Sequence, residues 1–149
     1  GDDTISVSGN GSDRMIFGSG YGHDILTNPG SGYNRDDTLV LKDLNPSDVQ
    51  VSRNGDVMTL RVLSSGDTFV VNFQFWGDGS QIKGLTHIQF ADGTIWDRTA
   101  IASNALISGT AGNDTINLPT SGATVDAGAG DDTLSVSGNG SDRIVFGIG

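Results

Sequence analysis

The chain of 149 residues contains no cysteine and no glutamate, since all 18 of its acidic residues are aspartate. Without cysteine it can form neither a disulfide framework nor a thiolate metal site. Any metal ion that stabilises the fold must therefore be bound by oxygen ligands. Glutamate favours helices, whereas aspartate favours turns, caps and short-range chelation. We therefore expect a chain that is poor in helix.

Basic residues are also scarce, because eight Lys and Arg leave a formal net charge of −10. Nucleic acids and anionic membranes are bound by clustered Lys and Arg, so we expect no nucleic-acid partner and no membrane insertion. A cation is the natural counterpart of this charge. The sequence has no initial Met, no signal-peptide pattern and no long apolar run, and we expect an excerpt of a larger protein.

Glycine, in contrast, is abundant: 23 residues are present, against roughly 10 at the average usage of about 7%. Low-complexity disorder is one explanation for such a composition. However, 35% of the residues are hydrophobic, and they recur at short regular intervals bounded by glycine turns. This pattern predicts a packed all-β chain.

The chain ends by repeating its beginning. Residues 1–20 and 130–149 match at 16 of 20 positions, at a fixed offset of 129 residues. Three of the four changes keep an apolar side chain, and only Ser19, which corresponds to Ile148, changes character. We expect a tandem array with a unit of 129 residues, of which this chain is an excerpt cut inside a repeated structure.

A shorter repeat lies within the tail, where Ile116, Val125 and Leu134 are nine residues apart. The residues before them follow the pattern G-x-D-x-(apolar)-x, which predicts a tight glycine turn followed by a very short strand with one inward side chain. Two such units make a coil of about 18 residues, and stacked coils form a parallel β-roll.

The residue types indicate what such turns bind. Glycine permits positive φ angles and close backbone approach, and aspartate supplies a short, hard oxygen ligand. Carboxylates together with carbonyls suit Ca²⁺, which takes six to eight oxygens. One apolar side chain per turn makes a thin core, so we expect metal binding to contribute much of the folding free energy.

These segments resemble the RTX, or haemolysin-type, calcium-binding nonapeptide repeats, GGxGxDxUx with U apolar. The matching segments are GTAGNDTIN (109–117), AGAGDDTLS (127–135), SGNGSDRIV (137–145), SGNGSDRMI (8–16) and SGYGHDILT (19–27). The resemblance implies that each Ca²⁺ lies between turns one coil apart, held by Asp side chains and turn carbonyls.

Turns one coil apart can then be paired. Three pairs are expected, Asp114 with Asp132, Asp3 with Asp24, and Asp13 with Asp37, at separations of 18, 21 and 24 residues. The ligands that the resemblance implies are seven aspartates and thirteen turn residues: Asp3, Asp13, Asp24, Asp37, Asp114, Asp132, Asp142, Gly9, Asn10, Gly11, Gly20, Gly22, Gly109, Ala111, Gly112, Gly128, Ala129, Gly130, Gly138 and Gly140.

Some residues depart from the pattern. Ala123 takes an Asp position, so the site that it shares with Asp142 lacks a carboxylate, and Asn34 and Arg35 stand where glycines are expected before Asp37. Four other aspartates have a different expected role, the capping of local turns. They are Asp2, Asp36, Asp126 and Asp131.

The middle of the chain has longer strands. Segments 48–53, 57–62 and 68–73 alternate in period two between glycine turns, which predicts an antiparallel meander, and 86–90 and 94–96 predict a further pair. Single helical turns are expected at 45–48 and 97–100. The ending IQFADGTIWD (88–97) resembles the haemolysin-type calcium-binding protein-related domain. We expect a β-roll half at 1–38, an antiparallel capping or linker domain at 39–102, and a second roll half at 103–149.

Other sites have weaker signals. Aromatic residues could form a sugar-stacking surface, although aromatics in strands are more often core; they are Tyr21, Tyr33, Phe73, Phe75, Trp76 and Trp96. His23 and His87 have no zinc-binding spacing and are expected to be solvated or hydrogen-bonded. No nucleophile motif or catalytic carboxylate pair is recognisable, so the sequence predicts no enzyme and no catalytic residues.

The function expected from this reading is a calcium-binding structural repeat module of a large secreted or surface bacterial protein, which folds on Ca²⁺ outside the cell. Its partners would be several calcium ions and neighbouring repeats, with carbohydrate or a cell surface as a further possibility. By resemblance, export would use a type I secretion channel. The alternatives are a calcium-dependent carbohydrate-binding module and the noncatalytic RTX tail of a secreted protease or lipase.

Overall fold

The computed structural model describes residues 1–9, 11–29, 35–79, 83–119 and 122–146, and in these ranges it confirms the all-β class. The single α-helix of the described residues is α1 (Arg98–Asn104), and two 3-10 turns are η1 (Pro46–Asp48) and η2 (Trp76–Gly79). None of the described helices is long and apolar enough to span a bilayer. Asn10, Tyr33 and Asn34 lie outside the described residues.

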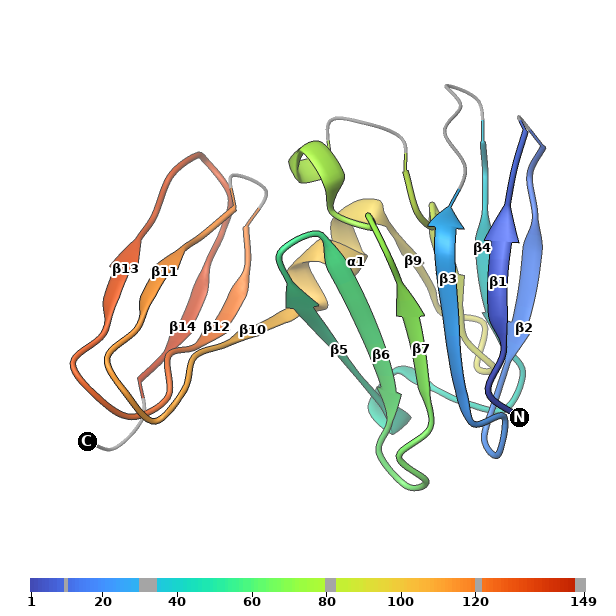
Figure 1. Cartoon of the computed structure of the whole chain (residues 1–149), viewed down its shortest axis with the longest axis horizontal. Coiled ribbons are helices and arrows are strands. Elements are labelled where there is room, and N and C mark those ends of the chain that lie inside the picture. The colour runs from blue at the N-terminus through green and yellow to red at the C-terminus, as the bar shows by residue number, and fades with distance from the viewer. Residues whose placement is uncertain (10, 30–34, 80–82, 120–121, 147–149) are drawn as a thin grey trace.

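One long sheet runs through the molecule (Figure 1). Its strands, from edge to edge, are β1 (Thr4–Val7), β3 (His23–Pro29), β7 (Thr68–Val71), β6 (Val57–Val62), β5 (Val49–Asn54), β10 (Leu106–Ser108), β12 (Thr124–Asp126) and β14 (Arg143–Val145). The predicted meander β5–β6–β7 is antiparallel, and the pairs on either side of it are parallel. The meander thus joins two parallel segments into one sheet.

Two smaller sheets contain the other paired strands of the described residues. One contains β2 (Arg14–Phe17), β4 (Thr38–Leu41), β8 (His87–Gln89) and β9 (Ile95–Asp97), and the other contains β11 (Thr115–Asn117) and β13 (Thr133–Ser135). Successive nonapeptide strands alternate between the long sheet and a smaller one, and strands one coil apart pair in parallel. This is the β-roll that the nine-residue step predicts.

The apolar side chains of the described residues form two clusters of very different size. The larger cluster has eighteen buried residues in these ranges, including Phe17, Leu26 and Leu39 from the N-terminal coils and Leu60 and Val71 from the meander. The smaller cluster lies in the C-terminal roll and contains four buried residues in the same ranges, Ile116, Leu118, Ala123 and Val125. The N-terminal coils therefore share a core with the middle of the chain, whereas the C-terminal coils have only their own.

The helix after β9 is longer than the sequence predicts. A single turn was expected at 97–100, but α1 continues to Asn104. Asp97 caps its start, because its Oδ1 accepts a hydrogen bond from the Ala100 amide at 2.8 Å. Ile101 is fully buried in the larger cluster, and this burial explains why the helix extends beyond one turn.

The two copies of the repeated sequence lie at opposite ends of the molecule and use opposite strand edges (Figure 1). In the first copy, β1 and β2 pair with the strands that follow them, β3 and β4. In the second copy, β13 and β14 pair with the strands that precede them, β11 and β12. Nearly the same sequence therefore forms the first coil of one roll and the last described coil of another.

The larger cluster predicts that two leucines of the β6 hairpin differ sharply in how much they contribute to the free energy of unfolding. Leu60 is fully buried, whereas Leu63 is 56% exposed. We expect Leu60→Ala to lower the free energy of unfolding by about 2–5 kcal/mol, and Leu63→Ala by no more than about 0.5 kcal/mol. Urea denaturation followed by circular dichroism measures both, and equal losses would contradict this division of the core.

Candidate metal centres

Four stacked pairs of nonapeptide turns share one polar contact. The residue at the motif Asp position donates its backbone N–H to the carboxylate of the Asp one coil later. These hydrogen bonds run from Asp3 to Asp24 (2.9 Å), from Asp13 to Asp37 (2.9 Å), from Asp114 to Asp132 (3.0 Å) and from Ala123 to Asp142 (2.9 Å). The structure thus brings together the three Asp pairs expected from the spacing, and it pairs Asp142 with Ala123.

This contact fixes where the downstream carboxylate of each pair lies. The backbone N–H of the upstream Asp donates to one oxygen of the downstream carboxylate. That oxygen therefore lies beside the upstream Asp. Two anions one coil apart repel each other, and they do so most strongly where water is excluded. A cation that both carboxylates contact would turn this repulsion into attraction.

The turns of the C-terminal roll approach each other backbone to backbone. An alanine Cβ in place of Gly109 would overlap the Ala127 carbonyl oxygen, and one at Gly128 would overlap the Thr110 carbonyl oxygen. At Gly130, where φ is +121°, a Cβ would lie 2.7 Å from the Gly112 carbonyl carbon. Only glycine allows such an approach, which places the carbonyl groups of successive turns side by side.

The donor set fits calcium. Within the described ranges no three Asp or His side chains converge, so a cation between coils would take two carboxylates and complete its coordination with backbone carbonyls. Ca²⁺ accepts six to eight oxygens of both kinds. Asp114 and Asp132 would supply the carboxylates, and the expected carbonyls are those of Gly109, Ala111, Gly112, Gly128, Ala129 and Gly130.

The first N-terminal turn has a similar arrangement, with less exposure. Asp24 is 7% exposed, and a Cβ at Gly22 would lie 2.8 Å from the Gly1 carbonyl oxygen. Asp2 accepts a hydrogen bond from the His23 amide at 2.9 Å. The expectation that Asp2 caps a local turn is therefore wrong, because its carboxylate contacts the next coil.

Asp36 also departs from its expected role. Its Oδ1 accepts a hydrogen bond from the Thr86 hydroxyl at 2.6 Å and lies 2.8 Å from His87 Nδ1. The hydrogen bond from Thr86 has the larger effect and the contact with His87 the smaller one, and both lower the pKa of Asp36 below its ordinary value. Asp36 thus ties the turn to the start of β8, whereas Asp126 accepts from the Gly128 amide at 3.2 Å and caps its turn as expected.

Sequence reasoning missed Asp67. Its Oδ2 accepts hydrogen bonds from Ser65 Oγ at 2.5 Å and from the Gly20 amide at 2.6 Å, and these contacts lower its pKa. The strand that follows, β7, pairs with β3 as a further coil would. The signal was present in the sequence, because Asp67-Thr68-Phe69 repeats the Asp-Thr-apolar order of 132–134.

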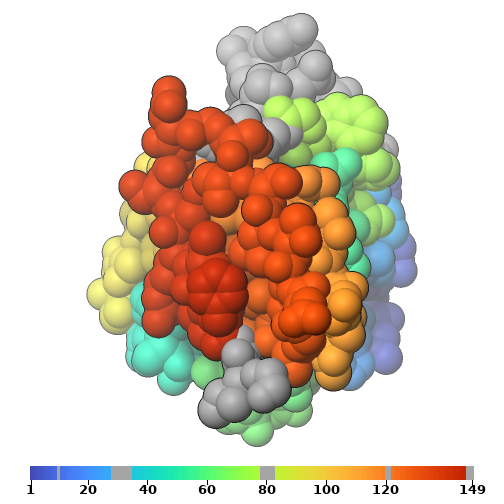
Figure 2. Space-filling view, turned by 90° about the vertical axis from the view of Figure 1, so that its left-hand side faces the viewer, coloured from blue at the N-terminus to red at the C-terminus, as the bar shows by residue number. Residues whose placement is uncertain are grey.

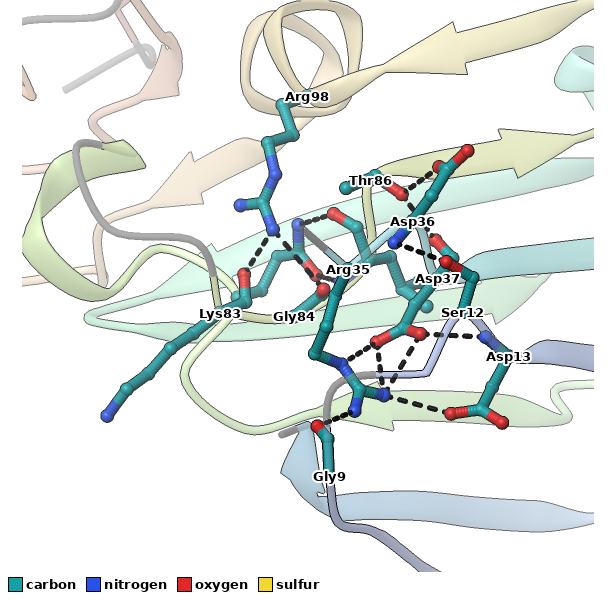
Figure 3. Close-up of polar contacts among 12 residues, drawn as sticks. Gly9, Ser12, Asp13, Arg35, Asp36, Asp37, Lys83, Gly84, Thr86 and Arg98 are labelled. Carbon is teal, nitrogen blue, oxygen red and sulfur yellow. Dashed lines mark hydrogen bonds and ion pairs between the residues drawn. The ribbon is translucent and has the colours of Figure 1, made fainter. Parts of the chain in front are cut away.

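The second N-terminal turn holds a cation of its own (Figure 3). The Arg35 guanidinium contacts Asp13, Asp37 and the Gly9 carbonyl oxygen, and all three were expected metal ligands. Arg98 donates to the Lys83 carbonyl oxygen at 2.7 Å. Burial lowers the pKa of Arg98, and the charge of Asp37 opposes that shift.

The remaining expected ligands lie in more open turns. Nothing lies within 4 Å of a Cβ built on Gly9, Gly11 or Gly20. Gly138 has a φ of +105° and lies with Gly140 in the turn before Asp142. The sequence places these residues at glycine positions of the motif, but the structure shows close backbone contact chiefly in the Gly109–Gly130 turns and at Gly22.

The histidines and aromatic residues have identifiable partners. His23 Nδ1 lies 3.0 Å from Thr68 Oγ1, so both histidines are hydrogen-bonded as expected. Phe75 is buried in the larger cluster and Trp96 packs against it. Phe73 and Trp76 are each 40% exposed, but Lys83 Nζ lies 4.6 Å from the Trp76 ring centroid and 5.4 Å from that of Phe73. An ammonium group therefore lies near both rings, which stay partly exposed.

Comparison with known proteins gives a family match in the middle of the chain. Residues 58–100 match the family model described as haemolysin-type calcium binding protein related domain. No curated protein sequence is detectably similar to the chain. Among solved structures, the extracellular lipase LipA from Serratia marcescens matches with 15% identity and a TM-score of 0.41, over 97% of this chain and 27% of the lipase chain.

The close turns of the C-terminal roll can be tested with two glycines of nearly equal φ. Gly128 (+85°) and Gly20 (+82°) both require a left-handed backbone, but only at Gly128 would a Cβ overlap the next turn. We expect Gly20→Ala to lower the free energy of unfolding by roughly 1–2 kcal/mol and Gly128→Ala by clearly more. Urea denaturation in excess calcium measures the difference, and equal effects would show that the turns do not approach so closely.

Proposed function

Because residues 58–100 form a haemolysin-type calcium binding protein related domain, flanked by coils with paired aspartates, we propose that the chain is a calcium-binding structural module. Its nonapeptide coils close around Ca²⁺, and its central strands join and cover the coils. The role is mechanical and noncatalytic. It suits a large protein of repeated units outside the cell, where calcium is plentiful.

The observation that carries this proposal is the Asp114–Asp132 pair. The two residues are held one coil apart by the hydrogen bond from the Asp114 amide to the Asp132 carboxylate, beside glycine turns that leave no room for a side chain. A bound Ca²⁺ would supply two positive charges and a coordination shell that accepts these carboxylates and carbonyls. The chain supplies the geometry, because the turns already stack at the required register.

The need for metal is greatest in the C-terminal roll. Its cluster has four buried residues, against eighteen in the larger cluster, and it buries correspondingly little apolar surface. A ligand that binds only the folded state stabilises it by about 2.7 kcal/mol at a concentration of 100 Kd. That contribution is large beside so small a core, so calcium controls the folding of this roll.

The larger cluster gives the middle of the chain a different behaviour. Its apolar burial needs no metal, and it includes side chains of the N-terminal coils. We propose that the central strands stay folded without calcium and provide the edge, β5, on which the C-terminal roll assembles through β10. This is how a capping element supports a solenoid, since it covers the otherwise open end of the coils.

The biological setting follows from the same coupling of folding to calcium binding. Where calcium is scarce, the coils with unneutralised carboxylates remain open, which suits passage through a secretion channel as an unfolded chain. Outside the cell, sites with dissociation constants of about 10⁻⁴–10⁻³ M would fill, and the coils would close. We propose a secreted or surface location on this basis.

A calcium titration tests the proposal. In excess chelator we expect part of the far-UV β signal to be missing, because the C-terminal coils are open, and addition of calcium restores it. Asp132→Asn should raise the calcium midpoint at least about tenfold, the smaller end of what is lost when even a residue that only orients a ligand is removed.

The matched control is Asp126→Asn, which removes the same charge six residues away from a carboxylate that caps a local turn. We expect its midpoint to change much less. A full β signal in excess chelator would contradict calcium-linked folding, and equal midpoints for the two variants would contradict the assignment of the ligand.

A further inference from the structure

One turn of the N-terminal coils carries an arginine where its relatives carry glycine. Two residues before each of the other six motif aspartates the sequence has glycine, namely Gly1, Gly11, Gly22, Gly112, Gly130 and Gly140. Before Asp37 the same position holds Arg35. From the sequence alone, Arg35 is only a departure from the motif.

In the structure the arginine side chain points into the space between the two turns (Figure 3). Its side chain is 2% exposed, and that of Asp37 is 1% exposed. Arginine is almost never so deeply buried unless its charge is paired. Here Asp13 and Asp37 pair with the guanidinium charge, and this pairing accounts for the burial of Arg35.

The contacts of the guanidinium are those expected of a calcium ion. Nη2 lies 2.9 Å from Asp13 Oδ2 and 2.8 Å from Asp37 Oδ2, and Nε lies 2.9 Å from Asp37 Oδ2. Nη1 donates to the Gly9 carbonyl oxygen at 2.6 Å. One cationic group therefore contacts two carboxylates one coil apart and a turn carbonyl.

The backbone register of this turn is also that of the other pairs. The Asp13 amide donates to Asp37 Oδ1 at 2.9 Å, as the Asp114 amide does to Asp132 Oδ1 at 3.0 Å. The coil is therefore closed in the usual way, but its positive charge comes from the chain. A guanidinium in this position and a metal ion in the same space exclude each other.

We propose that Arg35 is a built-in cation that takes the place of Ca²⁺ between Asp13 and Asp37, so that this turn closes without metal. The inference rests on the proposed function, since it presumes that equivalent turns bind calcium. It divides the chain into a calcium-independent N-terminal turn, attached to the larger cluster, and a calcium-dependent C-terminal roll.

The first test removes the arginine side chain. In Arg35→Ala the two carboxylates and the Gly9 carbonyl lose their cation, and we expect the number of calcium ions bound per chain to rise by one in native mass spectrometry. The matched control is Arg14→Ala, which removes the same charge from an exposed side chain beside Asp13. Its calcium number should stay that of the unaltered chain. No additional ion in a folded Arg35→Ala variant would overturn the proposal.

A second test keeps Arg35 in place, in case its removal prevents folding. If Asp13 pairs with Arg35 and not with metal, Asp13→Asn leaves the number of bound ions unchanged, whereas Asp132→Asn lowers it by one. Loss of an ion from Asp13→Asn would overturn the proposal. Failure of the proposed function is distinguishable, because the unaltered chain would then bind no calcium at all.

Discussion

The repulsion between aspartate carboxylates stacked one coil apart is the constraint on which this structure depends. A β-roll places the same motif position of each coil above the last, so anions that are far apart in sequence must lie together. The chain meets this constraint in two ways. At Asp13 and Asp37 a buried arginine is already in contact with both carboxylates, and at Asp114 and Asp132 the oxygen donors suit a calcium ion.

The distribution of apolar burial complements this difference. The N-terminal coils pack their inward side chains into the cluster of the central strands, whereas the C-terminal coils pack against one another. When the molecule is viewed from the C-terminal end, the C-terminal coils, coloured orange and red, make up most of the visible face (Figure 2). A roll that shares a large core can tolerate a weak motif. Under the proposed function, the C-terminal roll, whose cluster has four buried residues among those described, would need its charges neutralised.

The sequence predicts the parts of the fold that depend on local spacing. The nine-residue step places alternate strands in opposite sheets, and the separations of 18, 21 and 24 residues identify the Asp pairs that the structure brings together. Long-range side-chain contacts were not predictable in this way. The contacts of Arg35, Asp36 and Asp67 each depend on which strand lies beside the turn, and the length of α1 depends on the pocket that receives Ile101.

Hydrogen exchange of the full chain, followed by mass spectrometry with and without calcium, tests the central claim most directly. We predict that amides of β11–β14 exchange slowly in calcium and rapidly in excess chelator, while amides of β5–β7 stay protected in both conditions. Equal protection of β11–β14 in excess chelator would contradict the account, because the small cluster would then hold the C-terminal roll closed without any cation.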